Sequence, residues 1–252
     1  MEITWYGTAA IKIHNSHGSI LFDPFVPLSG SDISTVLSDY DGATDIFVTH
    51  GHFDHITHLP SVVLRNPDVN IYCTKTPYQT LRKKGIPERN LVSICYGSEI
   101  NISGFHIHAY HGKHAALPLP TISRLTYMLQ SKNRRNLPFI MKEHLRCQEN
   151  DETLFYQIEC DGKQLSLMGS LNLRNDVVYP TGSDLLILPY NGWADNYPPA
   201  VRVIQRLNPK KILLDHYDDT FPPVTIPLNL NPILEQYPDK IRPLALNKVE
   251  YL

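Results

Sequence analysis

The opening part of the chain is built from short apolar runs, some of which alternate with polar residues. Ile3–Trp5 and Ile11–His14 read as strands on either side of Gly7. Ser19–Pro24 reads as an apolar strand that ends in a carboxylate and a proline, and Asp45–Thr49 as a further buried strand. This spacing predicts a sheet that forms from the first residues onward.

The next part mixes a helix with further strands. A helix over residues 77–84 is predicted because a proline stands in its first turn and Gly85 follows its last residue. Strands then resume at Leu91–Ile94 and Phe105–Tyr110, where the second strand alternates strictly. The stretch from about residue 118 to residue 151 breaks this rhythm and predicts two helices around Asn133–Pro138.

Strands return in the last part of the chain. A hairpin turn at Asp161-Gly162 joins two of them, and a helix near Pro199–Leu207 separates two more. The four predicted strands are Thr153–Cys160, Gln164–Met168, Asp184–Leu188 and Lys211–Leu214. Hairpins argue against an all-parallel sheet, so we expect two mixed β-sheets packed face to face with helices outside. One α/β domain over residues 1–252, with a helical insert at about 118–151, is the expected organisation.

Composition and charge exclude several classes of protein. Apolar residues make up 42% of the 252 residues, and the net charge is −2, so no global basic field draws the chain to nucleic acid or to anionic lipid. No apolar run approaches the length that spans a bilayer, and the first residues do not resemble a signal peptide. The four scattered cysteines are expected to be free thiols, which together with these features predicts a cytoplasmic protein.

Histidine is the residue that changes this picture. The chain has twelve, and several gather in the run His50-Gly51-His52-Phe53-Asp54-His55 directly after a predicted strand. A spacing of two in extended chain puts His50 and His52 on one side, where both can bind one cation. Asp54 and His55 follow where the chain turns and can face a second cation. Nitrogen and carboxylate ligands suit zinc, with manganese or iron as alternatives.

With its preceding strand, the run from Ile46 to His55 resembles the signature of the metallo-β-lactamase superfamily. Other parts of the chain resemble that superfamily too: Ile3–Ala9, Ile20–Pro24, Ala109–His111, Asp184–Pro189 and Leu213–Asp219. The sequence is also similar, through weaker signals than this run, to the branch that contains the L-ascorbate-6-phosphate lactonases and related metal-dependent hydrolases. This resemblance implies a four-layer αββα sandwich with the site at one edge, between the sheets.

The resemblance also implies which residues bind metal. The first cation would be held by His50, His52 and His111, and the second by Asp54, His55 and His216. The strand pattern supports this independently, because His50, His111 and His216 each follow an apolar strand. Asp23 is expected to support a ligand imidazole through a hydrogen bond, or else to cap the turn at Pro24.

One position departs from the family pattern. Most members have an aspartate that bridges both metals after the hairpin strand, whereas this chain has Gly169-Ser170. A neutral hydroxyl is a poorer ligand for a dication than a carboxylate. We therefore expect one or two bound ions, with a weaker second site, or Asn172 or a water molecule in place of the missing ligand.

These residues predict a hydrolase that acts through a metal-bound hydroxide on an ester, lactone or phosphodiester bond of a small metabolite. Asp54 would orient the attacking water or accept its proton, and His216 would serve as a ligand first and a leaving-group donor second. His114 is a candidate for substrate contact. A nuclease, or an impaired metal- or ligand-sensing protein of the same fold, is the alternative.

The insert follows the loop after His111, so we expect it to lie over the metals as a lid. Its basic residues would then bind an anionic group of the substrate. The basic residues of the insert are Lys132, Arg134, Arg135, Lys142 and Arg146. For each single basic residue we favour a solvated helical face instead, because acidic residues lie nearby. No nucleic-acid or membrane partner is expected.

Overall fold

Two mixed β-sheets, each of seven strands, form the centre of the protein. The computed structural model describes residues 1–116, 120–191, 195–226 and 228–252, and all fourteen strands belong to these parts. Each sheet joins antiparallel strands to parallel ones: β1, β2 and β3 pair antiparallel, for example, while β3, β4, β5 and β6 pair parallel. The predicted pair of mixed sheets flanked by helices is confirmed.

The first sheet contains mostly strands from the amino-terminal half. In the order of their pairing these are β14 (Val249–Tyr251), β1 (Glu2–Trp5), β2 (Ile11–Asn15), β3 (Gly18–Phe22), β4 (Asp45–Phe47), β5 (Asn70–Cys73) and β6 (Leu91–Ser93). The second sheet contains β13 (Ile241–Pro243), β12 (Lys211–Asp215), β11 (Leu185–Pro189), β10 (Lys163–Met168), β9 (Leu154–Cys160), β8 (Phe105–His111) and β7 (Glu99–Ile102). The last strand of the chain thus returns to pair with the first.

Helices connect and cover the strands. The described α-helices are α1 (Phe53–Ile56), α2 (Leu59–Arg65), α3 (Lys75–Lys83), α4 (Ile122–Gln130), α5 (Leu137–Arg146), α6 (Tyr197–Leu207) and α7 (Asn231–Gln236). Short 3-10 turns occur at Leu37–Tyr40, Glu88–Asn90 and Arg134–Asn136. The two helices predicted within residues 118–151 correspond to α4 and α5, while residues 118 and 119 lie outside the described residues.

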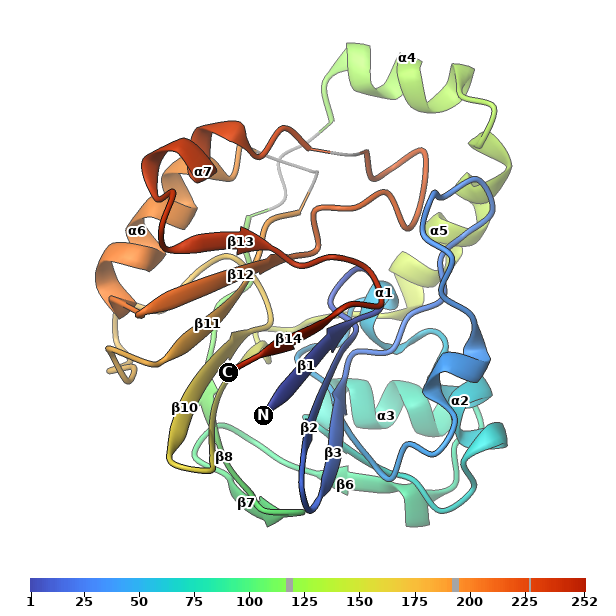
Figure 1. Ribbon diagram of the computed structural model, residues 1–252. Coiled ribbons are helices and arrows are strands. Elements are labelled where there is room, and N and C mark those ends of the chain that lie inside the picture. The colour runs from blue at the N-terminus through green and yellow to red at the C-terminus, as the bar shows by residue number, and fades with distance from the viewer. Residues whose placement is uncertain (117–119, 192–194, 227) are drawn as a thin grey trace.

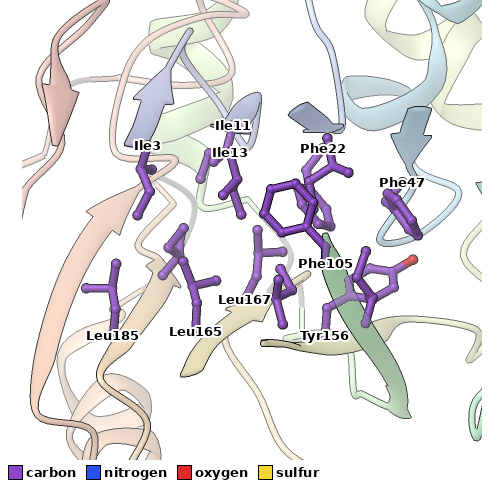
Figure 2. Packing of buried hydrophobic residues seen from close by; sticks show 14 of the residues in the cluster. Ile3, Ile11, Ile13, Phe22, Phe47, Phe105, Tyr156, Leu165, Leu167 and Leu185 are labelled. Atoms are coloured by element: carbon purple, nitrogen blue, oxygen red, sulfur yellow. The ribbon is translucent and has the colours of Figure 1, made fainter. Parts of the chain in front are cut away.

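The main core lies between the two sheets. Figure 2 shows Ile3, Ile11 and Phe22 of the first sheet facing Leu165, Leu167 and other residues of the second. Aromatic rings add contacts across the interface, as in the edge-on packing of Phe22 against Tyr156. The sheets therefore adhere through apolar side chains whose removal from water is the dominant favourable contribution to folding.

Helices cover the outer face of each sheet, because the central strands carry apolar residues on both faces. In β11, Leu185 and Ile187 enter the core between the sheets, while Leu186 and Leu188 pack against α6 and α7. The first sheet has the same arrangement on its other face, where α2 and α3 cover it. Figure 1 shows α6 and α7 on one side of the molecule and α2 and α3 on the other. The order of layers is helices, sheet, sheet, helices.

The sheets are joined at the edge where their parallel strands end. The Leu154 amide donates to the Thr49 carbonyl at 2.8 Å, and the Tyr156 hydroxyl donates to the Val48 carbonyl at 2.8 Å. Thr49 follows β4, and Leu154 begins β9. Chain segments that leave the ends of β3, β4, β10 and β12 consequently meet along one rim.

No helix in the described ranges combines the length and hydrophobicity needed to cross a membrane.

One ion pair attaches α5 to the body of the protein. Glu143 of α5 is buried and pairs with Lys84, which follows α3. Thr57, after α1, donates weakly to the same carboxylate at 3.4 Å. In Figure 1, α5 runs from the region of α1 up toward α4, which stands away from both sheets. The position of α4 therefore depends on how firmly α5 is held.

Replacing Glu143 with glutamine should lower the free energy of unfolding by about 2 kcal/mol, because Lys84 would lose its partner in a poorly solvated position. Burial alone raises the pKa of Glu143, but the hydrogen bond and charge of Lys84 hold it below the usual value. The stabilisation is therefore complete above the unfolded-state pKa and is lost as the pH falls through the folded-state pKa.

Urea denaturation of both proteins at neutral and acidic pH measures this difference. Glu88→Gln is the matched control, because Glu88 pairs with Arg82 on the surface, where both side chains are mostly exposed and such pairs contribute little. Equal effects of the two substitutions, or a difference that grows in acid, would contradict the role assigned to Glu143.

Candidate metal centre

Three histidine rings form the first group of possible ligands. His50, His52 and His114 each place one ring nitrogen within 4.8 Å of the others. His50 Nε2 lies 3.2 Å from His52 Nδ1, and the His114 ring centroid lies 4.5 Å from that of His52. His50 and His52 come from the turn between β4 and α1, as the sequence predicted, whereas His114 comes from the loop after β8.

A carboxylate and two histidines form the second group. Asp54, His55 and His216 are buried, and their ligand atoms also lie within 4.8 Å of one another. Asp54 Oδ2 is 3.2 Å from His216 Nε2 and 3.6 Å from His55 Nε2. The short helix α1 turns Asp54 and His55 inward, and His216 follows the end of β12.

The two groups adjoin each other. The ring centroids of His50 and His55 are 3.9 Å apart, and those of His55 and His216 are 5.9 Å apart. The geometry is therefore that of two neighbouring cation sites rather than of two independent ones.

Asp23 fixes the orientation of two of these rings. Its carboxylate is fully buried, and its Oδ2 lies 2.8 Å from His55 Nδ1 and 2.5 Å from Thr49 Oγ1. Because the Thr49 hydroxyl donates to Asp23, it is free to accept from His50 Nδ1 at 3.0 Å. Both rings thus direct Nδ1 toward these acceptors and turn Nε2, the atom that would bind a metal, toward the site. The predicted support role of Asp23 agrees with these contacts.

His114 is held in the same way by backbone groups. Its Nδ1 lies 2.7 Å from the Ala115 carbonyl, which leaves Nε2 unprotonated. The Ala115 amide donates to Ser170 Oγ at 3.0 Å, and the Asn172 side chain donates to the His114 carbonyl at 3.4 Å. Ser170 and Asn172, the two residues considered for the missing carboxylate, therefore hold the loop that carries His114.

His216 occupies a strained backbone position. Its φ is +59°, in the left-handed region that non-glycine residues seldom adopt, and its amide donates to the Thr8 carbonyl at 3.0 Å. Its Nδ1 is buried and has no hydrogen-bond partner in the described part of the chain. The other ring nitrogen, Nε2, lies 3.2 Å from Asp54 Oδ2, so it is Nε2 that faces the second group and can bind a cation.

Two glycines allow the backbone to close around the site. A Cβ on Gly51, within the histidine run, would lie 2.1 Å from the Gln148 carbonyl oxygen. A Cβ on Gly169 would lie 2.6 Å from Thr49 Cβ. Any side chain at these positions would push apart the segments that carry the ligands.

The first group is suited to bind a cation as neutral imidazoles. Burial and the neighbouring histidines hold the pKa of His50 well below its ordinary value, and burial together with His114 lowers that of His52 to about 4. Burial also lowers the pKa of His114. At neutral pH all three rings therefore have lone pairs available.

The second group is built to attract positive charge. Burial opposes charge on His216, but Asp54 outweighs it and raises the pKa of His216 to about 9. The pKa of His55 is also raised, because Asp23 and Asp54 outweigh the effect of burial. These carboxylates favour a cation among the rings, so a metal ion would bind there by displacing protons. The donor chemistry of both groups fits metal binding.

The structure does not bring His111 into either group. His111 is the last residue of β8 and pairs with Leu154 of β9, so the strand ladder holds its backbone. Its ring stacks on Tyr96 with centroids 4.6 Å apart, and its Nε2 lies 2.8 Å from the Asp151 carbonyl. The geometry places His114, predicted only as a substrate contact, where His111 was expected, because the chain needs three more residues to reach the other rings.

Both groups open into one cavity of about 540 Å³, a size typical of small-molecule sites. Residues of α4 and α5 line it opposite the metal ligands, together with Pro189, Phe221 and Val224. His144 of α5 also lines it, and its ring centroid is 5.9 Å from that of His52. Nothing in the spacing of His144 along the sequence identifies it as part of the site.

Comparison with known proteins shows the family to which the chain belongs. The family model described as "Beta-lactamase superfamily domain" matches residues 19–217. A metal-dependent hydrolase of Alkaliphilus metalliredigens is 25% identical over 235 residues, which cover 89% of this chain and 88% of that protein. A metal-dependent hydrolase of Xanthobacter autotrophicus is 41% identical over only 63 residues, about a quarter of each chain. The structure of a metallo hydrolase from Ignicoccus hospitalis matches with a TM-score of 0.64 and 18% identity, covering 100% of this chain and 99% of that one, which shows a shared fold.

The chain therefore belongs to the metallo-β-lactamase superfamily. Within it, the chain is similar along nearly its whole length to proteins named metal-dependent hydrolases, which confirms the predicted class of enzyme. The bond that it breaks does not follow from this membership.

Replacing His114 with alanine should weaken metal binding by more than the roughly 100-fold that loss of a supporting hydrogen bond costs, because a direct ligand is removed. His111→Ala is the control and should bind metal like the unchanged protein. Competition with a coloured chelator measures both affinities. If His111→Ala loses metal and His114→Ala keeps it, the assignment of the third histidine is wrong.

Replacing Asp23 with asparagine should lower metal affinity by about 10- to 100-fold, because the amide cannot fix the rings of His55 and His50 as the carboxylate does. The matched control is Asp45→Asn. Asp45 is a buried aspartate at the start of β4, and its carboxylate accepts hydrogen bonds from the side chains of Asn70 and Tyr72. Calorimetric titration of both variants checks this. Equal losses of affinity would mean that Asp23 acts only through the stability of the sheet.

Proposed function

We propose that this chain hydrolyses an ester, lactone or phosphodiester bond of a small molecule at the paired metal site. The observation that carries the proposal is the meeting of two adjoining ligand groups with a cavity of substrate size. A bound cation would lower the pKa of a water molecule and polarise the oxygen of the scissile group.

The residues of the chain would orient the reactants. Burial raises the pKa of Asp54, but the charges of His55 and His216 outweigh burial and keep the carboxylate ionised. Asp54 is therefore suited to accept a hydrogen bond from the attacking water and to fix its position. We favour a role for His216 as a metal ligand over a role as proton donor to the leaving group, because both roles would use the same ring.

Zinc is the ion that we propose, with manganese or iron as alternatives. Five histidine nitrogens and one carboxylate form the two groups, and imidazole suits all three metals. Ser170 supplies no negative charge at the rim, so we expect the second ion to bind more weakly than the first.

A lactonase-like reaction, as in the branch with the ascorbate-6-phosphate enzymes, belongs to this proposal as one case of ester hydrolysis. A reducing, cytoplasmic location is also proposed, supported by four cysteines that are all free thiols.

Metal-stripped protein, reloaded with zinc, manganese or iron, should hydrolyse at least one member of a panel of aryl esters, lactones and phosphodiesters. Stripping the metal should abolish this activity, and Asp54→Asn should lower kcat by about 100-fold. Asp176→Asn is the control, because Asp176 is an exposed partner of Arg174. Initial rates and elemental analysis on the same samples give both readouts.

The alternative is an impaired sensor of metal or ligand, which Ser170 favours. Tight binding of one ion with no turnover on the whole panel would support it and contradict hydrolysis. In that case Ser170→Asp should raise the amount of bound metal, since it restores a carboxylate beside the His114 loop.

A further inference from the structure

Apart from His144, the residues of α4 and α5 that line the cavity are apolar. Leu125, Met128 and Leu129 of α4 contribute to it, together with Leu137, Ile140 and Met141 of α5. Leu125, Met128 and Leu129 follow the spacing that places side chains on one face of a helix. Two helices therefore present an apolar stripe toward the metal centre.

The charged residues of this segment point elsewhere. No lysine or arginine is found among the described residues that line the cavity, and Asp54 is the one acidic residue there. Arg135 donates to Ser29 at 2.6 Å, and Arg146 pairs with Glu143 at 3.8 Å. The expectation that basic residues of the segment would bind an anionic group thus finds no support in the lining.

Helix α4 has no core of its own. None of its residues is buried, and Leu125 and Leu129, which face the cavity, are 43% and 65% exposed. Apolar side chains left in contact with water around a concave site favour an apolar ligand, because its binding removes both surfaces from water. A ligand in the cavity would supply the contacts that α4 lacks.

We propose that the substrate carries an uncharged apolar group, such as an alkyl or aryl chain, which fills the space under α4 and α5 while the scissile bond lies at the metals. This inference rests on the proposed hydrolysis and adds the class of substrate to it. Hydrolysis consumes one water: its oxygen bonds to the acyl carbon, the acyl–oxygen bond breaks, and the leaving oxygen takes a proton.

The experiment compares para-nitrophenyl esters from acetate to octanoate with the metal-loaded full-length protein. The ratio kcat/KM should rise by about fourfold for each added methylene until the cavity is filled. Leu125→Glu should lower kcat/KM about tenfold more for octanoate than for acetate, since only the longer chain reaches α4.

Ile122→Glu is the matched control. Ile122 lies on the same helix, is 84% exposed and does not line the cavity, so the same charge there should change neither ester. Circular dichroism of both variants shows whether α4 still folds. A loss that appears equally in both variants, or no dependence of kcat/KM on chain length, overturns the proposal while leaving hydrolysis itself intact.

A binding measurement separates this proposal from the proposed function. Octanol should compete with the dye Nile red for the cavity of the metal-loaded protein, which would quench or shift the fluorescence of the bound dye. Leu125→Glu should weaken dye binding by about tenfold, whereas Ile122→Glu should leave it unchanged. If no ester is hydrolysed and this pattern of dye binding appears, the apolar site stands and the hydrolase proposal fails. If phosphorylated or carboxylated esters are preferred over their neutral counterparts, the apolar substrate class is wrong.

Discussion

The buried carboxylate of Asp23 is the constraint on which the whole site depends. A charge with no exposure to solvent must be satisfied by hydrogen bonds, and Asp23 accepts them from the Thr49 amide, the Thr49 hydroxyl and the His55 ring. These bonds tie the end of β3 to the end of β4, and they set the ring orientation of His55 directly and of His50 through Thr49. The Thr49 carbonyl in turn accepts from Leu154 of the second sheet. One carboxylate thus links the packing of both sheets to the chemistry of the ligands.

Much of this arrangement is encoded locally, which is why the sequence could predict it. His50, His52, Asp54 and His55 stand within six residues after a buried strand, and His216 follows another strand, so strand ends that meet at one edge bring them together. The identity of the third histidine in the first ligand group depends on where β8 ends. We predicted that the strand ends at Tyr110, but β8 pairs with β9 through His111. The strand pairing therefore fixes the backbone of His111, and its ring stacks on Tyr96. Register and strand length are set by pairing between distant segments, and no local pattern distinguishes His111 from His114.

The helical segment gives a second example of what charge counting misses. Its basic residues offered a way to bind an anionic substrate, yet none of them is among the described residues that line the cavity, and Arg135 and Arg146 instead contact the side chains of Ser29 and Glu143. The informative signal was the spacing of Leu125, Met128 and Leu129, which is visible in the sequence as an apolar stripe. A stripe on a helix normally faces a core, and only the structure shows that here it faces a cavity beside the metal ligands. Composition identifies which side chains are present, whereas function depends on the surface that they line.

The substitution at Ser170 can be understood from the origin of His114. A histidine at a strand end is held by the ladder, but His114 lies three residues beyond one, where the backbone has no strand partner to fix it. The Ser170 hydroxyl supplies that restraint by accepting from the Ala115 amide, and Asn172 adds a bond to the His114 carbonyl. At position 170 the chain therefore has a neutral hydroxyl, which holds the His114 loop, in place of the metal-bridging carboxylate of the family pattern. Asp54 is then the single carboxylate among the six ligand groups, so two bound cations would experience unequal charge. Three neutral imidazoles would hold the first, whereas the second would be held beside Asp54, with Asp23 behind the His55 ring. The charge of Asp54 thus offsets part of the affinity that the second site loses because residue 170 is a serine and not a carboxylate.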